Sequence, residues 1–76
     1  TVLVTGGSKG LGLLLARRFA RESANLALVA RDPEDLARAA LELNRRYGAR
    51  VLTVACDVRD EAAVERAVAR TLKAFG

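Results

Sequence analysis

Apolar residues fall into three short runs that alternate with three segments of helical periodicity. The runs at 2–4, 26–30 and 51–55 are mostly apolar at consecutive positions, which is typical of buried parallel strands. In the segments that follow each run, apolar residues recur at spacings of three and four, which predicts amphipathic helices. Strands that alternate with helices in this way pair in parallel through right-handed crossovers. The pattern therefore predicts an α/β fold, a βαβαβα half of a doubly wound parallel sheet.

Each predicted helix is expected to bury one apolar stripe against this sheet. In the first helix, Arg17, Arg18 and Arg21 lie off the stripe and are expected to face solvent. The stripes consist of Leu11, Leu14, Leu15 and Phe19 in the first helix, Leu36, Ala40, Leu43 and Tyr47 in the second, and Val64, Val68, Leu72 and Phe75 in the third.

The ends of the second and third helices have recognisable end signals. Asp32 can cap the second helix by accepting hydrogen bonds from free amide groups of its first turn, and Pro33 suits the first helical position. Gly48 suits the left-handed residue that follows a helix. Asp60 can cap the third helix in the same way as Asp32. The sequence therefore predicts helix starts directly after Asp32 and Asp60 and a helix end before Gly48.

The composition narrows the class of protein. The chain has 76 residues, of which 51% are hydrophobic and 29% charged, as in a globular protein of one small domain or part of one. Aromatic residues make up only 4%, which argues against stacking platforms for single-stranded nucleic acid. No apolar stretch approaches the roughly 20 residues that a membrane helix needs. We therefore expect neither nucleic acid nor a membrane as a partner.

Charge and cysteine content exclude further chemistries. The net charge is +4, but the eleven arginines and two lysines are spread along the chain, which favours a solvated surface over a dedicated anion-binding patch. Cys56 is the only cysteine and there is no histidine, so an internal disulfide and a zinc site are both excluded. Without a histidine to activate it, Cys56 is expected to pack rather than to act as a nucleophile. A lone cysteine also favours the reducing cytosol, and we expect a cytoplasmic protein.

The most informative segment is Thr5-Gly6-Gly7-Ser8-Lys9-Gly10-Leu11-Gly12, between the first predicted strand and the first predicted helix. Amide groups at a helix start are unpaired and carry partial positive charge, so an anion can bind there. Glycines let the backbone turn sharply and approach a pyrophosphate closely. We expect Gly6, Gly10 and Gly12 to serve a pyrophosphate. Ser8 could donate to a phosphate or ribose oxygen, or alternatively bond its own backbone.

These glycines, spaced Gly-x-x-x-Gly-x-Gly after a Thr-Gly step, differ from both the Gly-x-Gly-x-x-Gly fingerprint and the Walker loop. They resemble the cofactor signature of the short-chain dehydrogenase/reductase family. Two further segments agree: Cys56-Asp57-Val58 resembles the Asp-Val pair of that family, whose aspartate contacts the adenine ring, and residues 47–51 resemble the approach to the third strand. The resemblance covers the whole chain. It implies a Rossmann-like fold, a nicotinamide cofactor, a small-molecule carbonyl or alcohol substrate and, for the full-length enzyme, a homo-oligomer.

Asp57 also has a rationale that is independent of the resemblance. It follows a parallel strand, and the carboxyl ends of such strands are where α/β sheets bind ligands. Its carboxylate could accept a hydrogen bond from the adenine amino group; alternatively, it satisfies turn amides before the third helix. Val58 would line the adenine pocket or, alternatively, pack without a ligand.

The end of the second predicted strand bears on the choice between NAD and NADP. By resemblance, the acid that selects NAD would fall at Ala30, which has no carboxylate. Arg31 follows, where family members that use NADP often carry arginine, and Lys9 matches a second basic position linked to NADP. An arginine can hold the ribose 2′-phosphate with two hydrogen bonds. We therefore expect NADP rather than NAD, although both residues could instead be solvated. Asp32 would favour NAD if it turned into the site, but its place before Pro33 favours the capping role.

The resemblance also implies a catalytic tyrosine with a nearby lysine and serine, and none of these can be placed here. Tyr47 is the only tyrosine and lacks the Tyr-x-x-x-Lys spacing, so it is not assigned a catalytic role. The chain ends where a fourth strand should begin. We expect residues 1–76 to be the N-terminal part of an NAD(P)-binding Rossmann domain in a longer NADP(H)-dependent oxidoreductase. Alone, this part is expected to be inactive, because it lacks the acid–base residues. It is also expected to be marginally stable or self-associating, because one edge of its sheet would lack a neighbour.

Two other functions compete with this one. The first is a non-catalytic NAD(P)-binding or sensing module. The second is another Rossmann-like enzyme such as a methyltransferase, although Arg31 and Lys9 would meet no phosphate on an adenosyl ligand. No catalytic residue and no metal ligand is expected within the chain. The residues expected to contact the cofactor are Gly6, Ser8, Lys9, Gly10, Leu11, Gly12, Arg31, Asp57 and Val58.

Overall fold

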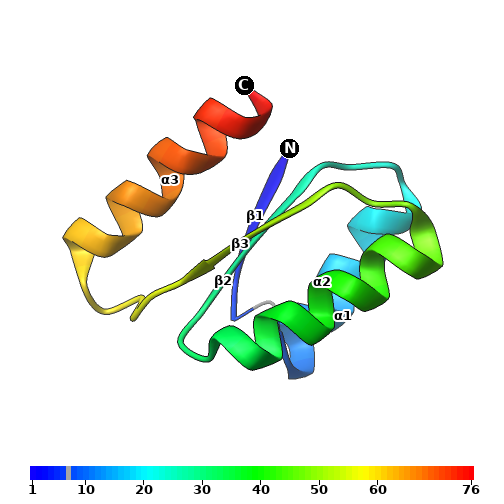
Figure 1. The fold of residues 1–76 in the computed structure, drawn as a ribbon, viewed down its shortest axis with the longest axis horizontal. Helices are drawn as coiled ribbons and strands as arrows, with labels where there is room; N and C mark the ends of the chain where they lie inside the picture. The colour runs from blue at the N-terminus through cyan, green and yellow to red at the C-terminus, as the bar shows by residue number, and fades with distance from the viewer. Residues whose placement is uncertain (7) are drawn as a thin grey trace.

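A computed structural model describes residues 1–6 and 8–76, and in these residues three strands alternate with three helices (Figure 1). The elements in chain order are β1 (Val2–Thr5), α1 (Gly10–Arg21), β2 (Leu26–Ala30), α2 (Pro33–Tyr47), β3 (Val51–Ala55) and α3 (Glu61–Phe75). Strands β2 and β3 have the predicted bounds, and β1 continues one residue beyond the predicted run. The predicted starts of α2 and α3 are also confirmed.

The three strands form a parallel sheet in the order β1-β2-β3. Thr5 lies opposite Val29, and Ala30 lies opposite Ala55, so the carboxyl ends of the strands meet at one edge. The ladder continues past β1, because the amide of Gly6 donates to the carbonyl of Val29 at 2.7 Å. The glycine segment, the turn into α2 and the loop into α3 therefore share this edge (Figure 1). The Rossmann-like α/β fold is confirmed.

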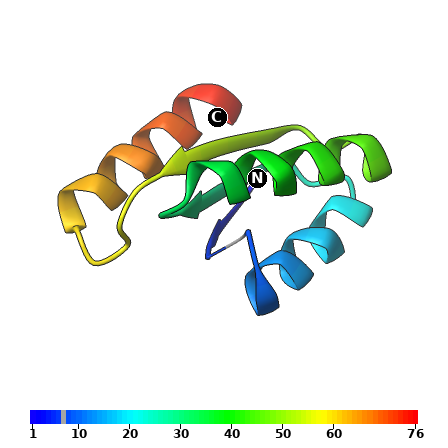
Figure 2. The same ribbon diagram turned by 60° about the horizontal axis from the view of Figure 1, so that its bottom comes forward.

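The helices form a layer on each face of the sheet, with α1 and α2 on one side and α3 on the other (Figure 2). Strand β2 is central, and its residues 26–29 are buried. The larger core, on the α1 and α2 side, consists of Val4, Ala16, Ala20, Leu26, Leu28, Leu36, Ala39, Leu43 and Ala49. The smaller core, on the α3 side, consists of Val29, Val54 and Ala67, with Leu3, Leu52 and Cys56 packed against it. The expectation that Cys56 packs is thus confirmed.

The buried face of α1 differs from the predicted stripe. Ala16 and Ala20 are the buried residues of this helix, whereas Leu11, Leu14 and Leu15 are 72%, 59% and 45% exposed. Because α1 is apolar on most of its circumference, spacing alone did not identify the packed face. Close packing against β1, β2 and α2 favours small side chains, so Ala16 and Ala20 are buried. Leu13, outside the predicted stripe, and Phe19, within it, are partly buried against the same core.

The buried face of α3 also differs from the predicted stripe. Its buried residues are Ala63, Ala67 and Thr71, while Val68 and Leu72 of the predicted stripe are 41% and 61% exposed. The hydroxyl of Thr71 donates to the carbonyl of Ala67 at 2.8 Å, which satisfies it inside the helix. In both helices the fully buried residues are small, whereas Phe19, Val64 and Phe75 of the predicted stripes are only partly buried. Helix α2 instead buries Leu36 and Leu43, as predicted, together with Ala39.

The helix-end signals have the predicted geometry. Oδ1 of Asp32 accepts from the amide of Glu34 at 2.9 Å, and Gly48 follows α2 with φ of 69° in the left-handed region. Oδ1 of Asp60 accepts from the amide of Ala63 at 3.2 Å. Within residues 1–6 and 8–76, no helix combines the length and apolarity needed to cross a membrane.

The Asp60 cap has a measurable consequence. Replacing Asp60 by alanine is expected to lower the free energy of unfolding of the full-length protein by about 1 kcal/mol, because an amide of the first turn of α3 loses its acceptor. Chemical denaturation followed by circular dichroism measures this change. Glu65→Ala, at an exposed position within the same helix, is the matched control. An equal loss in both variants would contradict the capping role.

Candidate functional site

The glycine segment after β1 has the backbone conformation that glycine permits. Gly6 and Gly10 have φ of 67° and 54°, in the left-handed region where other residues are strained. Apart from adjacent backbone, no heavy atom of the described residues lies within 4 Å of the place where a Cβ would stand at either glycine, so the space beside this backbone is open. Gly7 lies outside the described residues. A ligand can therefore approach the backbone at Gly6 and Gly10 closely.

The start of α1 differs from the starts of the other two helices. Lys9 is its N-cap residue and makes no capping hydrogen bond through its side chain, and the first turn contains no acidic residue. The amide of Leu13 donates to the carbonyl of Lys9 at 3.2 Å and closes the first turn, so the amides of Gly10, Leu11 and Gly12 precede it. Helices α2 and α3 are capped by aspartates. Helix α1 thus offers its amides and the positive end of its dipole to an anion.

Lys9 contacts the beginning of α2. Its Nζ lies 2.9 Å from Oδ2 of Asp35, a carboxylate with only 6% exposure that also contacts the guanidinium of Arg38. The hydrogen bond and the charge of Asp35 raise the pKa of Lys9, and Asp32 adds to this effect. The same contact with Lys9 lowers the pKa of Asp35. Lys9 therefore lies close to the turn that contains Arg31, as a phosphate-binding role requires, but it already has a carboxylate partner.

Ser8 lines a hollow between α1 and α2. This hollow has a volume of about 220 Å³, and its wall includes Lys9, Asp35 and Arg38. Ser8 is half-buried there. The structure thus brings Ser8 and Lys9 together at the entry to the second helix.

The turn after β2 consists of Arg31 and Asp32, and their side chains have different surroundings. Ala30 is partly buried and has no polar side chain, Asp32 is engaged in the cap of α2, and Arg31 is exposed. The positive charge of Arg31 contributes to lowering the pKa of Asp57 at the end of β3, so these two side chains belong to one electrostatic environment. The carboxylate of Asp32 is thus engaged with amides of α2, whereas the side chain of Arg31 remains exposed.

Asp57 is held by Arg59 in the loop after β3. Its Oδ1 accepts from the backbone amide of Arg59 at 2.9 Å, and its Oδ2 accepts from Nη2 of the same residue at 2.9 Å. These hydrogen bonds lower the pKa of Asp57 to about 2. The carboxylate is thus ionised at neutral pH and acts as an acceptor. Val58, between the two, is 47% exposed and available to a ligand.

Sequence reasoning missed two partners in this site, Asp35 and Arg59. Asp35 lies in the first turn of α2, and no spacing in the sequence links it to Lys9. An aspartate followed two residues later by an arginine, directly after a strand, was a usable signal for the pair with Arg59, since aspartates commonly bond the backbone two positions on.

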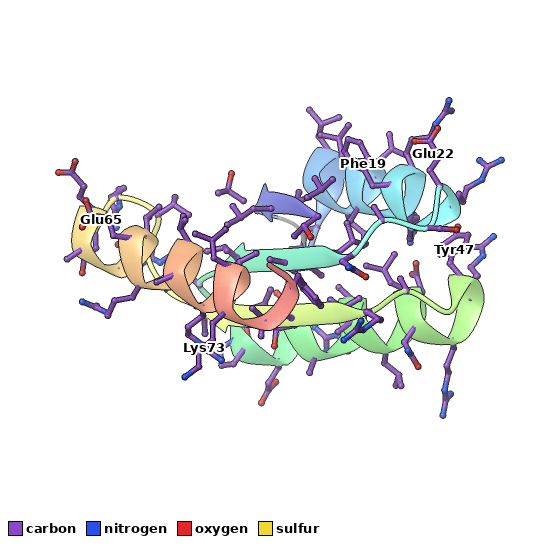
Figure 3. All side chains as sticks on the ribbon, turned by 90° about the horizontal axis from the view of Figure 1, so that it is seen from above. Phe19, Glu22, Tyr47, Glu65 and Lys73 are labelled. Atoms are coloured by element: carbon purple, nitrogen blue, oxygen red, sulfur yellow. The ribbon has the colours of Figure 1, made fainter. Side chains whose placement is uncertain are left out.

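Tyr47 lies far from this edge of the sheet. It ends α2, and Figure 3 shows it at the opposite end of the molecule from Glu65, which lies near the start of α3. The guanidinium of Arg46 lies 5.6 Å from the centre of its ring. Among residues 1–6 and 8–76, no group of three or more potential metal-ligating side chains is found.

Comparison with known proteins identifies the family to which this chain belongs. The model of the short chain dehydrogenase family matches residues 1–76. Levodione reductase from Leifsonia aquatica is 47% identical over 76 residues, which cover 99% of this chain and 28% of the reductase. The chain therefore belongs to the short-chain dehydrogenase/reductase family. Levodione reductase is named as an oxidoreductase and not as a methyltransferase.

Solved structures agree with this assignment. L-Sorbose reductase from Gluconobacter frateurii, solved with NADPH and L-sorbose, superposes with a TM-score of 0.93 at 42% identity, over 97% of this chain and 28% of that one. An NADPH-bound short chain oxidoreductase from Pseudomonas aeruginosa PAO1 superposes with a TM-score of 0.94 at 36% identity, over 99% of this chain and 30% of that one. The chain spans between 20% and 29% of the length of the curated relatives that it matches.

Proposed function

We propose that this chain is the N-terminal, cofactor-binding part of an NADP(H)-dependent oxidoreductase that interconverts a carbonyl and an alcohol. The observation that carries the proposal is the turn after β2. Ala30 has no carboxylate, Asp32 caps α2 through its side chain, and Arg31 is exposed. A 2′-phosphate, with up to about two negative charges, would find the exposed cation of Arg31 at this position, while the neighbouring carboxylate of Asp32 is engaged in the helix cap.

The glycine segment fits the part that all nicotinamide dinucleotides share. The open space at Gly6 and Gly10 and the uncapped start of α1 suit a pyrophosphate. Leu11 and Gly12 contribute amides at the same helix start. The bound cofactor supplies the hydride, and the residues of this chain bind and orient it.

Lys9 and Ser8 complete the phosphate end of the proposed site. An ammonium group has three donors, and the ion pair of Lys9 with Oδ2 of Asp35 engages one of them, so further donors can reach a phosphate. Lys9 and Arg38 together carry two positive charges against the one negative charge of Asp35. These three groups carry a net charge of +1, which the nearby Asp32 offsets, so the free donors of Lys9 and not the net charge of the cluster would hold a phosphate.

The adenine end is assigned to the loop after β3. The ionised carboxylate of Asp57 can accept a hydrogen bond from the adenine amino group, and the half-exposed Val58 offers an apolar surface to the ring. The tyrosine, lysine and serine that the family uses for proton transfer are assigned to the remainder of the enzyme.

Binding of both cofactors to the full-length protein tests this function. We expect NADPH to bind at least about tenfold more tightly than NADH, the ratio that one charge-assisted hydrogen bond of about 1.5 kcal/mol provides. Fluorescence titration measures both dissociation constants, and oxidation of NADPH in the presence of ketones and aldehydes measures turnover. Tighter binding of NADH would refute the cofactor assignment. Binding without turnover of any carbonyl compound would instead indicate a non-catalytic module.

A further inference from the structure

We propose that Arg59 is a positioning residue for adenine recognition: its guanidinium fixes the carboxylate of Asp57 in the orientation in which it meets the adenine amino group. This proposal rests on the proposed contact between Asp57 and adenine. It goes beyond that contact because Arg59 itself is not assigned a contact with the cofactor.

The contacts of Arg59 exceed what a turn requires. The backbone amide of Arg59 donates to Oδ1 of Asp57 at 2.9 Å, and this one hydrogen bond would suffice to close the turn. The side chain adds Nε at 3.1 Å from Oδ1 and Nη2 at 2.9 Å from Oδ2. A guanidinium that grips both oxygens fixes the plane of the carboxylate as well as its position.

The hydrogen bonds from Arg59 leave the carboxylate of Asp57 able to accept a further hydrogen bond from a ligand. Each carboxylate oxygen has about two lone-pair sites. Oδ2 accepts from Nη2 of Arg59 at 2.9 Å and, in a longer contact of 3.3 Å, from the Nε that it shares with Oδ1. The side chain of Asp57 is 35% exposed, whereas that of Arg59 is 75% exposed, so the carboxylate is the more enclosed partner. A second donor such as the adenine amino group can therefore reach Oδ2 while the pair stays intact.

The two arginines near Asp57 have separable roles. Arg31 acts on Asp57 through its charge, whereas Arg59 hydrogen-bonds it directly, and the hydrogen bonds of Arg59 are the largest cause of the low pKa of Asp57. Arg31 can therefore engage a phosphate without removing the partner of Asp57. The contribution of Arg59 is therefore the orientation of the Asp57 carboxylate, which its hydrogen bonds fix.

The test compares NADPH with its hypoxanthine analogue, in which a carbonyl oxygen replaces the 6-amino group of adenine. The full-length enzyme is expected to bind NADPH about tenfold more tightly than the analogue, because the analogue presents an acceptor to the acceptor Asp57. In Arg59→Leu we expect this ratio to fall to about threefold or less, and in Arg59→Lys to recover in part, since lysine keeps one charged donor. Arg66→Leu, an exposed arginine of α3, is the matched control and should keep the wild-type ratio.

A second variant separates this proposal from the function on which it rests. Asp57→Ala is expected to abolish the preference for NADPH over the analogue, and adding Arg59→Leu to it should cause no further change. If the wild type shows no preference for NADPH over the analogue, or if Asp57→Ala keeps the preference, the adenine contact of Asp57 is wrong. If Asp57→Ala abolishes the preference while Arg59→Leu retains it, the positioning role is wrong. A further change of the ratio in the double variant would mean that Arg59 contacts the cofactor directly, and it would also overturn the proposal.

Discussion

Replacing Arg31 by leucine is expected to weaken NADPH binding by about 10- to 150-fold and to leave NADH binding nearly unchanged. The loss corresponds to about 1.5–3 kcal/mol, the usual contribution of a hydrogen bond to a charged group. NADH has no 2′-phosphate, so the guanidinium of Arg31 has nothing to hold on that cofactor. Dissociation constants for both cofactors, measured on the full-length enzyme, check the prediction.

A matched variant separates a specific contact from a general effect of charge. Arg45→Leu removes an exposed arginine from the last turn of α2, at the far end of that helix, and should alter neither constant. The converse variant, Ala30→Asp, should shift the preference toward NADH, because its carboxylate accepts from the ribose hydroxyls and repels the phosphate. If Arg31→Leu weakens both cofactors equally, or neither, the phosphate contact is wrong, and Asp32 becomes the residue to examine.

The strands and the helix ends were predictable because local chemistry specifies them. A parallel strand covered on both faces needs consecutive apolar residues, and β2 has them. Pro33 cannot donate from its backbone nitrogen, which favours its place at a helix start and makes Asp32 the cap. Gly48 adopts the one conformation that few other residues tolerate. In each case a few neighbouring residues determine the outcome.

The packed faces of α1 and α3 and the partners in the site depend on tertiary structure. Helix α1 has apolar residues around most of its surface, and only contact with the sheet shows that Ala16 packs and Leu11 does not. Lys9 and Asp35 are 26 positions apart and meet only because both lie at the carboxyl edge of the sheet. The pair of Asp57 and Arg59 is local, but the grip of the guanidinium on both oxygens depends on the side-chain conformation. Spacing in the sequence contains none of this information.

Replacing Gly12 by valine is expected to weaken NADPH and NADH alike, in contrast to Arg31→Leu. Gly12 lies in the first turn of α1, beside the amides proposed to meet the pyrophosphate that both cofactors share. Valine is no worse than glycine as a helix former, so α1 itself should be retained. The added bulk would force ligand and helix apart at a cost of about 1–3 kcal/mol, or about 5- to 150-fold in each dissociation constant.

The control for this substitution is Ala69→Val, which places the same β-branched side chain at an exposed position of α3. It should change neither dissociation constant, and circular dichroism should show that both variants keep their helix content. If Gly12→Val weakens NADPH alone, Gly12 lies at the 2′-phosphate and not at the pyrophosphate. If it weakens neither cofactor, the start of α1 is not the anion site. Gly12 and Arg31 thus test different phosphates. Weaker binding of both cofactors in Gly12→Val would place the pyrophosphate at α1. Weaker binding of NADPH alone in Arg31→Leu would place the 2′-phosphate at the end of β2.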